Sequence, residues 1–111
     1  MKPVNLNYKT YGQGAKPLII MHGLLGTLDN WHSLAVKYSQ DFKVYTLDLR
    51  DHGKSPHTEG LSYHLMAEDL KLFMQEQSIG EAIVMGHSMG AKAAMFFTYY
   101  YPELVKKLIA V

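Results

Sequence analysis

The fold is decided by the segment Ala82-Ile83-Val84-Met85-Gly86-His87-Ser88-Met89-Gly90-Ala91. Its first four residues are typical of a buried strand, and the small and apolar residues from Met89 to Tyr101 predict a helix. Gly86, Ser88 and Gly90 therefore form a G-x-S-x-G pattern where a strand meets a helix. So sharp a turn strains the serine backbone, and glycines, which lack a Cβ, let the strand and the helix approach closely. We expect Ser88 to be a catalytic nucleophile.

Two further residues are expected to stabilise a negatively charged oxygen beside Ser88. A helix that begins just after Ser88 points its unpaired N–H groups and its positive end at the serine, so the Met89 N–H is one predicted donor. The second donor is expected from the turn His22-Gly23-Leu24-Leu25-Gly26, whose glycines allow a backbone amide to point inward. We assign it to Leu24. Without the G-x-S-x-G segment, these glycines would indicate only a tight turn.

Strands and helices are predicted to alternate along the rest of the chain. Apolar runs predict buried strands over residues 18–21 and 44–47 and a further strand over 105–111, and a weak two-residue alternation predicts an edge strand over residues 6–10. Helices are expected after the capping residues Asn30 and Ser62. In the second helix, Asp69 and the other polar residues are expected on the faces other than the apolar one. This order indicates the α/β class, with a mostly parallel sheet, helices on both faces and a site at the carboxyl ends of the strands.

Three motifs in this order resemble the α/β-hydrolase superfamily, in its small serine esterase and thioesterase branch. They are His22 to Gly26, the stretch Asp48-Leu49-Arg50-Asp51-His52-Gly53-Lys54-Ser55-Pro56, and Gly86 to Gly90. The resemblance covers residues 17–111 and implies the front half of that fold. It also implies that Ser88 forms an acyl-enzyme, that Leu24 and Met89 form the oxyanion hole, and that small carboxylic esters or thioesters, or amides, are cleaved.

The groups that activate the serine are not found after Ser88. In this fold the triad follows the chain order serine, acid, histidine, yet the only later acid is Glu103 and no histidine follows. The resemblance implies that the acid and the base lie beyond Val111. We therefore expect residues 1–111 to be a single partial domain without its acid, base and lid, and to be nearly inactive alone. The exposed last strand, residues 105–111, is expected to pair with a companion chain or to self-associate.

Composition excludes several classes of protein. The net charge of +1 and the scattered lysines argue against a nucleic-acid partner. The chain has no cysteine, and its 6 histidines form no metal-ligand spacing, so we expect no metal and no cofactor. No apolar run is long enough for a membrane span or a signal peptide, which favours a cytoplasmic protein.

The segment Asp48 to Ser55 is interpreted as a scaffold loop rather than as catalytic residues. Arg50 and Asp51 are expected to pair with each other or with nearby backbone, and Gly53 is expected to adopt a positive φ. Two alternatives to a serine hydrolase stay open: a non-catalytic fragment or interaction module of the same fold, and a related carbon–carbon bond hydrolase or acyltransferase. Relatives that cleave halides or epoxides would be expected to carry aspartate at position 88.

Overall fold

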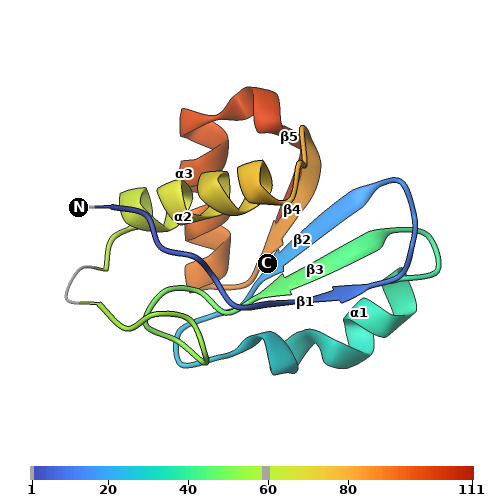
Figure 1. Ribbon diagram of the computed structural model, residues 1–111, viewed down its shortest axis with the longest axis horizontal. Coiled ribbons are helices and arrows are strands. Elements are labelled where there is room, and N and C mark those ends of the chain that lie inside the picture. The colour runs from blue at the N-terminus through green and yellow to red at the C-terminus, as the bar shows by residue number, and fades with distance from the viewer. Residues whose placement is uncertain (1, 59–60) are drawn as a thin grey trace.

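The computed structural model describes residues 2–58 and 61–111 and contains one five-stranded sheet (Figure 1). The strand order is β1-β3-β2-β4-β5, and only the pairing of β1 with β3 is antiparallel. The strands are β1 (Tyr8–Tyr11), β2 (Pro17–Met21), β3 (Lys43–Leu47), β4 (Ala82–Gly86) and β5 (Val105–Ala110). The predicted α/β class and the predicted edge positions of the first and last strands are confirmed.

Helices cover both faces of the sheet, as predicted. The α-helices are α1 (His32–Tyr38), α2 (Tyr63–Glu76) and α3 (Met89–Tyr100), and two short 3-10 helices are η1 (Leu28–Trp31) and η2 (Pro102–Leu104). In Figure 1, α2 and α3 lie on one side of the sheet and α1 lies on the other. None of these helices has the length and apolar character needed to cross a bilayer, within residues 2–58 and 61–111.

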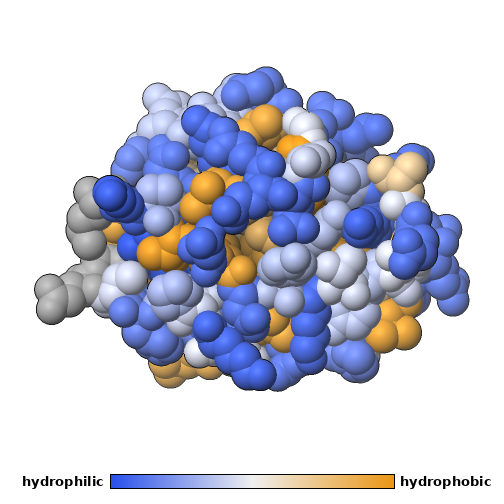
Figure 2. All heavy atoms as spheres, in the orientation of Figure 1, coloured by the Kyte–Doolittle hydropathy of each residue, from blue (hydrophilic) through white to orange (hydrophobic). Residues whose placement is uncertain are grey.

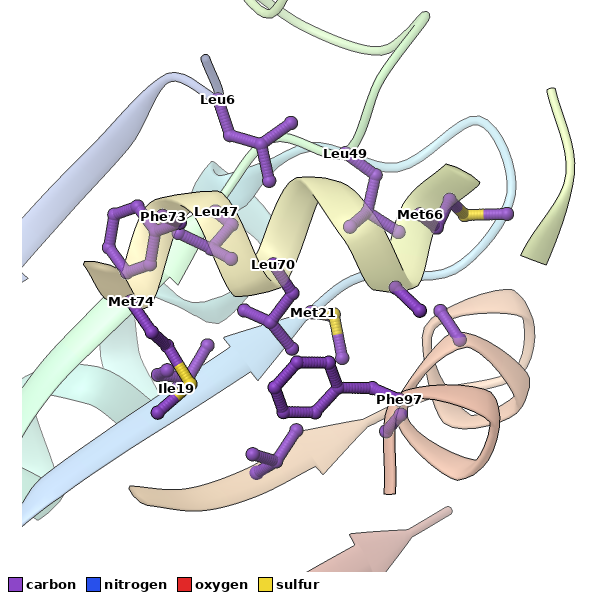
Figure 3. Packing of buried hydrophobic residues seen from close by; sticks show 14 of the residues in the cluster. Leu6, Ile19, Met21, Leu47, Leu49, Met66, Leu70, Phe73, Met74 and Phe97 are labelled. Carbon is purple, nitrogen blue, oxygen red and sulfur yellow. The ribbon is translucent and has the colours of Figure 1, made fainter. Parts of the chain in front are cut away.

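The strand β2 contacts the helix layers on both faces of the sheet through its alternate side chains. Its alternate residues Leu18 and Ile20 belong to the apolar cluster under α1, whereas Ile19 and Met21 belong to the larger cluster under α2 and α3. Figure 3 shows Met21, Leu70 of α2 and Phe97 of α3 pointing toward one another. A strand that is buried on both faces needs apolar residues at every position, which is why its sequence shows no alternation.

Helix capping agrees with the prediction at one helix and differs at the other. The Ser62 side chain accepts a hydrogen bond from the Leu65 N–H (3.1 Å) and caps α2, as predicted. The predicted cap Asn30 is wrong, because it lies inside η1 and its side-chain oxygen accepts from the Thr27 N–H (2.8 Å). Thr27 is the residue that caps this turn, and α1 begins at His32 without a side-chain cap. The chain enters α1 through a 3-10 turn, which displaces the cap upstream.

A buried ion pair joins the loop after β3 to α2. Arg50 donates from Nε to Asp69 Oδ2 (2.7 Å) and from Nη2 to Asp69 Oδ1 (2.8 Å), and both side chains are 1% exposed. Asp69, expected on a face of its helix other than the apolar one, is thus buried, and the main partner of Arg50 is Asp69 rather than Asp51 or nearby backbone. Both expectations are wrong. A buried guanidinium requires a carboxylate with two acceptor oxygens, and Asp69 on α2 meets this requirement. Asp69 also raises the pKa of Arg50 above its ordinary value, first through these hydrogen bonds.

The surface seen in Figure 2 is mostly hydrophilic, with small separate hydrophobic areas between polar side chains. Of the ten exposed large hydrophobic side chains among the described residues, six lie on two segments. One is the turn after β2, with Leu24 and Leu25, and the other is the second half of α3, with Met95, Phe96, Tyr99 and Tyr100.

Replacing Asp69 by Asn is expected to lower the free energy of unfolding by about 3 kcal/mol or more, because it leaves the buried Arg50 charge without its counter-ion. The measurement is urea denaturation of both proteins. The matched control is Glu81→Gln, which neutralises an exposed carboxylate and should change stability by less than about 0.5 kcal/mol. Equal stability of the two variants would contradict the role given to the ion pair.

Candidate active site

Ser88 occupies a strained turn between β4 and α3. Its backbone has φ 54° and ψ −113°, a conformation that a residue with a Cβ adopts only at a cost of about 1–3 kcal/mol. Hydrogen bonds from both sides hold the turn: the His87 N–H donates to the Met21 carbonyl (3.1 Å) and the Ser88 N–H to the Val111 carbonyl (3.1 Å). The ends of β2 and β5 thus fix the position of an exposed serine.

The two glycines of the turn are required by close backbone contacts. A Cβ at Gly86 would overlap the carbonyl of Gly90, and a Cβ at Gly90 would overlap the carbonyl of Met21. Any larger residue would push α3 away from β4 or from β2. The prediction that these glycines allow the strand and the helix to approach closely is confirmed.

The turn after β2 lies directly beside Ser88. The Gly26 N–H donates to the Gly23 carbonyl (3.0 Å) and closes the turn, with Leu25 in the left-handed region at φ 64°. A Cβ built at Gly23 would lie 3.4 Å from the Ser88 Cβ, so this backbone and the serine are in contact distance. The amide of Leu24 in this turn and the amide of Met89 at the start of α3 make no hydrogen bond within the described residues.

Two pockets meet at Ser88, and Leu24 also lines both. The first, of about 480 Å³, is bounded by the turn after β2 together with Asn30, Trp31 and His87. The second, of about 340 Å³, is bounded by apolar and aromatic side chains with one cation, Lys92. A substrate whose reacting carbon rests on Ser88 has room for one arm in each pocket.

Two histidines behind the turn after β2, His22 and His52, are committed to structure, whereas His87, next to Ser88, is exposed and packs edge-on against Trp31 with ring centroids 6.0 Å apart. His22 is fully buried, and its Nε2 accepts from the Leu49 N–H (2.9 Å) while its Nδ1 lies 2.7 Å from the Gly23 carbonyl, to which it donates. His52 is buried against it, with its Nδ1 2.9 Å from the Arg50 carbonyl. In the described part of the chain, no side chain hydrogen-bonds to the Ser88 hydroxyl. These contacts hold the His22 ring within the turn after β2 and the loop after β3.

Asp48, at the carboxyl end of β3, ties three segments together. Its Oδ1 accepts from the Leu28 N–H (2.8 Å), and its Oδ2 accepts from the Asn7 side chain (2.9 Å) and the Lys54 N–H (2.9 Å). Gly53 has the predicted positive φ of 52°, and a Cβ there would overlap the Asp48 carboxylate. The segment Asp48 to Ser55 is therefore a scaffold, as interpreted from its sequence.

Electrostatics in this scaffold favours charged Asp48 and neutral His22. Burial alone would raise the pKa of Asp48, but the hydrogen bonds from Lys54, Asn7 and Leu28 outweigh it, and the pKa lies below its ordinary value. Burial lowers the pKa of His22, assisted by neighbouring His52 and partly opposed by the hydrogen bond to Gly23 and by Asp48. No group of three or more metal-ligating side chains comes together within residues 2–58 and 61–111.

The family follows from comparison with known proteins. A family model described as the alpha/beta hydrolase fold matches residues 16–111. The chain belongs to the α/β-hydrolase family. Within that family it is 43% identical to the sn-1-specific diacylglycerol lipase ABHD11 of Danio rerio, over 98% of this chain and 36% of the lipase. It is 39% identical to esterase YbfF of Escherichia coli, over 86% of this chain and 37% of the esterase.

A solved α/β hydrolase superposes closely on the chain. The structure of a marine microorganism esterase has a TM-score of 0.95 and 47% identity, over 96% of this chain and 41% of that esterase. The chain thus spans well under half the length of the family members that it matches here.

The stability of this α/β-hydrolase chain is expected to fall as the pH is lowered. His22 has a folded-state pKa below its ordinary 6.5, so the unfolded chain binds more protons and stability declines from about pH 6.5 down to that folded pKa. Asp48 has a folded-state pKa below its ordinary 3.8, so its contribution is present above 3.8 and is lost as the pH falls through the folded pKa.

Urea denaturation across the range from pH 8 to pH 3 measures both effects. His22→Gln should flatten the slope of stability just below pH 6.5, and Asp48→Asn should flatten the slope below pH 3.8. The control His57→Gln, which changes an exposed histidine, should leave the slope as in the unsubstituted protein. An identical slope in His22→Gln would contradict the assignment.

Proposed function

We propose that the protein carrying this chain is a serine hydrolase that cleaves small carboxylic ester or thioester substrates through an acyl-enzyme. The observation that carries the proposal is the strained, exposed Ser88, held at the meeting point of two pockets. Such a turn is stable only where the surrounding backbone determines it, and backbone strain of this kind concentrates at functional sites. The printed names of the relatives, lipase and esterase, support the same class of reaction.

In the proposed reaction, the Ser88 hydroxyl oxygen attacks the substrate carbonyl carbon and the alcohol or thiol leaves. Water then hydrolyses the acyl-serine ester and releases the carboxylic acid. The amides of Leu24 and Met89 are proposed to donate to the oxyanion, because neither has another acceptor in the described structure and the two flank Ser88. The α3 N-terminus adds a positive partial charge at the same place.

The acid and base are proposed to come from residues outside these 111. A serine hydroxyl needs a general base to attack at pH 7. His22 and His52 are hydrogen-bonded elsewhere, and His87, which packs against Trp31, makes no hydrogen bond to the Ser88 hydroxyl within the described residues. The family members that match are more than twice as long as the matched part. We accordingly propose that residues 1–111 are a partial domain and nearly inactive alone.

The outer edge of β5 is proposed to pair with further chain or with a second molecule. In the described residues β5 pairs with β4 alone, so its other side presents unpaired N–H and C=O groups. A companion segment that adds a strand there would remove this edge.

A second candidate is an acyltransferase, in which an alcohol rather than water takes the acyl group from Ser88. It is favoured by 38% identity to the probable alcohol acetyltransferase of Saccharomyces cerevisiae, over 90% of this chain and 31% of that protein. Addition of an acceptor alcohol during ester turnover distinguishes the two, since a transferase forms a new ester while a hydrolase forms only the acid. The non-catalytic alternative predicts neither product.

Replacing Ser88 by Ala is expected to lower kcat/KM for p-nitrophenyl acetate by about 1,000-fold or more in the protein expressed from its complete gene. The control Ser33→Ala changes an exposed serine on α1 and should retain full activity. Full esterase activity in Ser88→Ala would refute the assignment of Ser88 as the nucleophile. An absence of activity in the unsubstituted protein toward all esters and thioesters tested would support the non-catalytic alternative.

A further inference from the structure

The second pocket at Ser88 carries one cation among apolar walls. Leu24, Leu61, Tyr63 and Met89 line it together with Ser88 and Lys92. The Tyr63 ring stacks on Phe96 of α3, with ring centroids 5.3 Å apart and planes 17° apart, so this wall is held in place. A ligand in this pocket therefore meets apolar side chains and a single ammonium group.

Lys92 lies in the first turn of α3 and lines the same pocket as Ser88, the residue that precedes this helix. The Lys92 N–H donates to the Ser88 carbonyl (3.1 Å), which is the spacing of one helical turn. Residues four apart lie one above the other, about 6 Å along the helix axis. The exposed ammonium group of Lys92 is therefore within reach of a substrate whose carbonyl carbon rests on the Ser88 hydroxyl.

The charge of Lys92 is available to a ligand. The ion pairs of the described residues involve Lys9 with Asp29, Arg50 with Asp69, and His64 with Glu68, and none of them uses Lys92. Among residues 2–58 and 61–111, no carboxylate lines this pocket. The described lining of the first pocket, on the other side of Leu24, contains no lysine, arginine or carboxylate. The two arms of an ester thus meet different environments, and one of them faces a positive charge.

We propose that the substrate is an ester or thioester that carries a carboxylate on one of its arms, and that Lys92 binds this carboxylate. This inference rests on the proposed function, since it requires the substrate carbonyl at Ser88. Lys92 acts as a specificity-determining residue: it attracts the anionic end while the apolar walls contact the chain between the carboxylate and the reacting carbon. A short arm fits, because Lys92 is one helical turn from the serine.

The test compares matched esters in the protein expressed from its complete gene. For the acyl arm the pair is the p-nitrophenyl monoester of glutaric acid and p-nitrophenyl butyrate. For the alcohol arm it is 4-acetoxybenzoate and phenyl acetate. The quantity measured is the ratio of kcat/KM for the carboxylate ester to kcat/KM for the neutral ester. Comparing this ratio between variants cancels the intrinsic reactivity of each ester.

Lys92→Met should lower the ratio about fivefold or more for one of the two arms, and Lys92→Glu should lower it further, because a negative side chain repels the carboxylate. Lys92→Arg should preserve most of the ratio, and added salt should shrink the effect by screening. The control Lys106→Met removes a lysine of β5 that does not line this pocket and should leave both ratios unchanged. The arm that responds identifies where the carboxylate lies.

Ratios that are the same in Lys92→Met and in the unsubstituted protein, for both arms, would overturn the proposal while leaving ester hydrolysis intact. A protein that hydrolyses none of the four esters would instead overturn the proposed function, and with it this inference. Circular dichroism of each variant confirms that the ratios compare folded proteins.

Discussion

The contact between α3 and β2 is the constraint on which the rest of the site depends. Gly90, in the first turn of α3, lies so close to the end of β2 that a Cβ would overlap the Met21 carbonyl. This approach fixes the angle at which the chain leaves β4, and it forces Ser88 into a positive φ. The cost of that conformation, about 1–3 kcal/mol, is offset by the burial of β2 and β4 between two layers of helices.

The loops at the carboxyl ends of the strands are held by buried polar groups. His22 and Asp48 each satisfy backbone amides from distant segments, and Arg50 joins the same region to α2 through Asp69. Buried charges are costly, yet here each is paired or fully hydrogen-bonded. The turn beside Ser88 is thereby fixed in place before any substrate binds, which is the arrangement that electrostatic catalysis requires.

Local patterns in the sequence were enough to predict most of the fold. The continuous apolar run of β2, the cap Ser62 and the G-x-S-x-G segment each depend on neighbours in the chain, and each is confirmed in the structure. Asp69, the partner of Arg50, and Leu28 and Asn7, two of the partners of Asp48, were not predicted, because they lie about 20 or more residues away and no local signal marks them. Asp69 was expected away from the apolar face of its helix, because the helical period alone does not reveal that a buried cation, Arg50, lies opposite it.

The central claim is that Ser88 is the acyl-accepting nucleophile, and a covalent adduct tests it most directly. The protein expressed from its complete gene is treated with a fluorophosphonate, the residual esterase activity is followed, and the modified peptide is identified by mass spectrometry. We expect one adduct, on Ser88, whose occupancy rises in step with the loss of activity. Loss of activity with the adduct on another residue, or full activity with Ser88 modified, would contradict the role of Ser88 as the nucleophile.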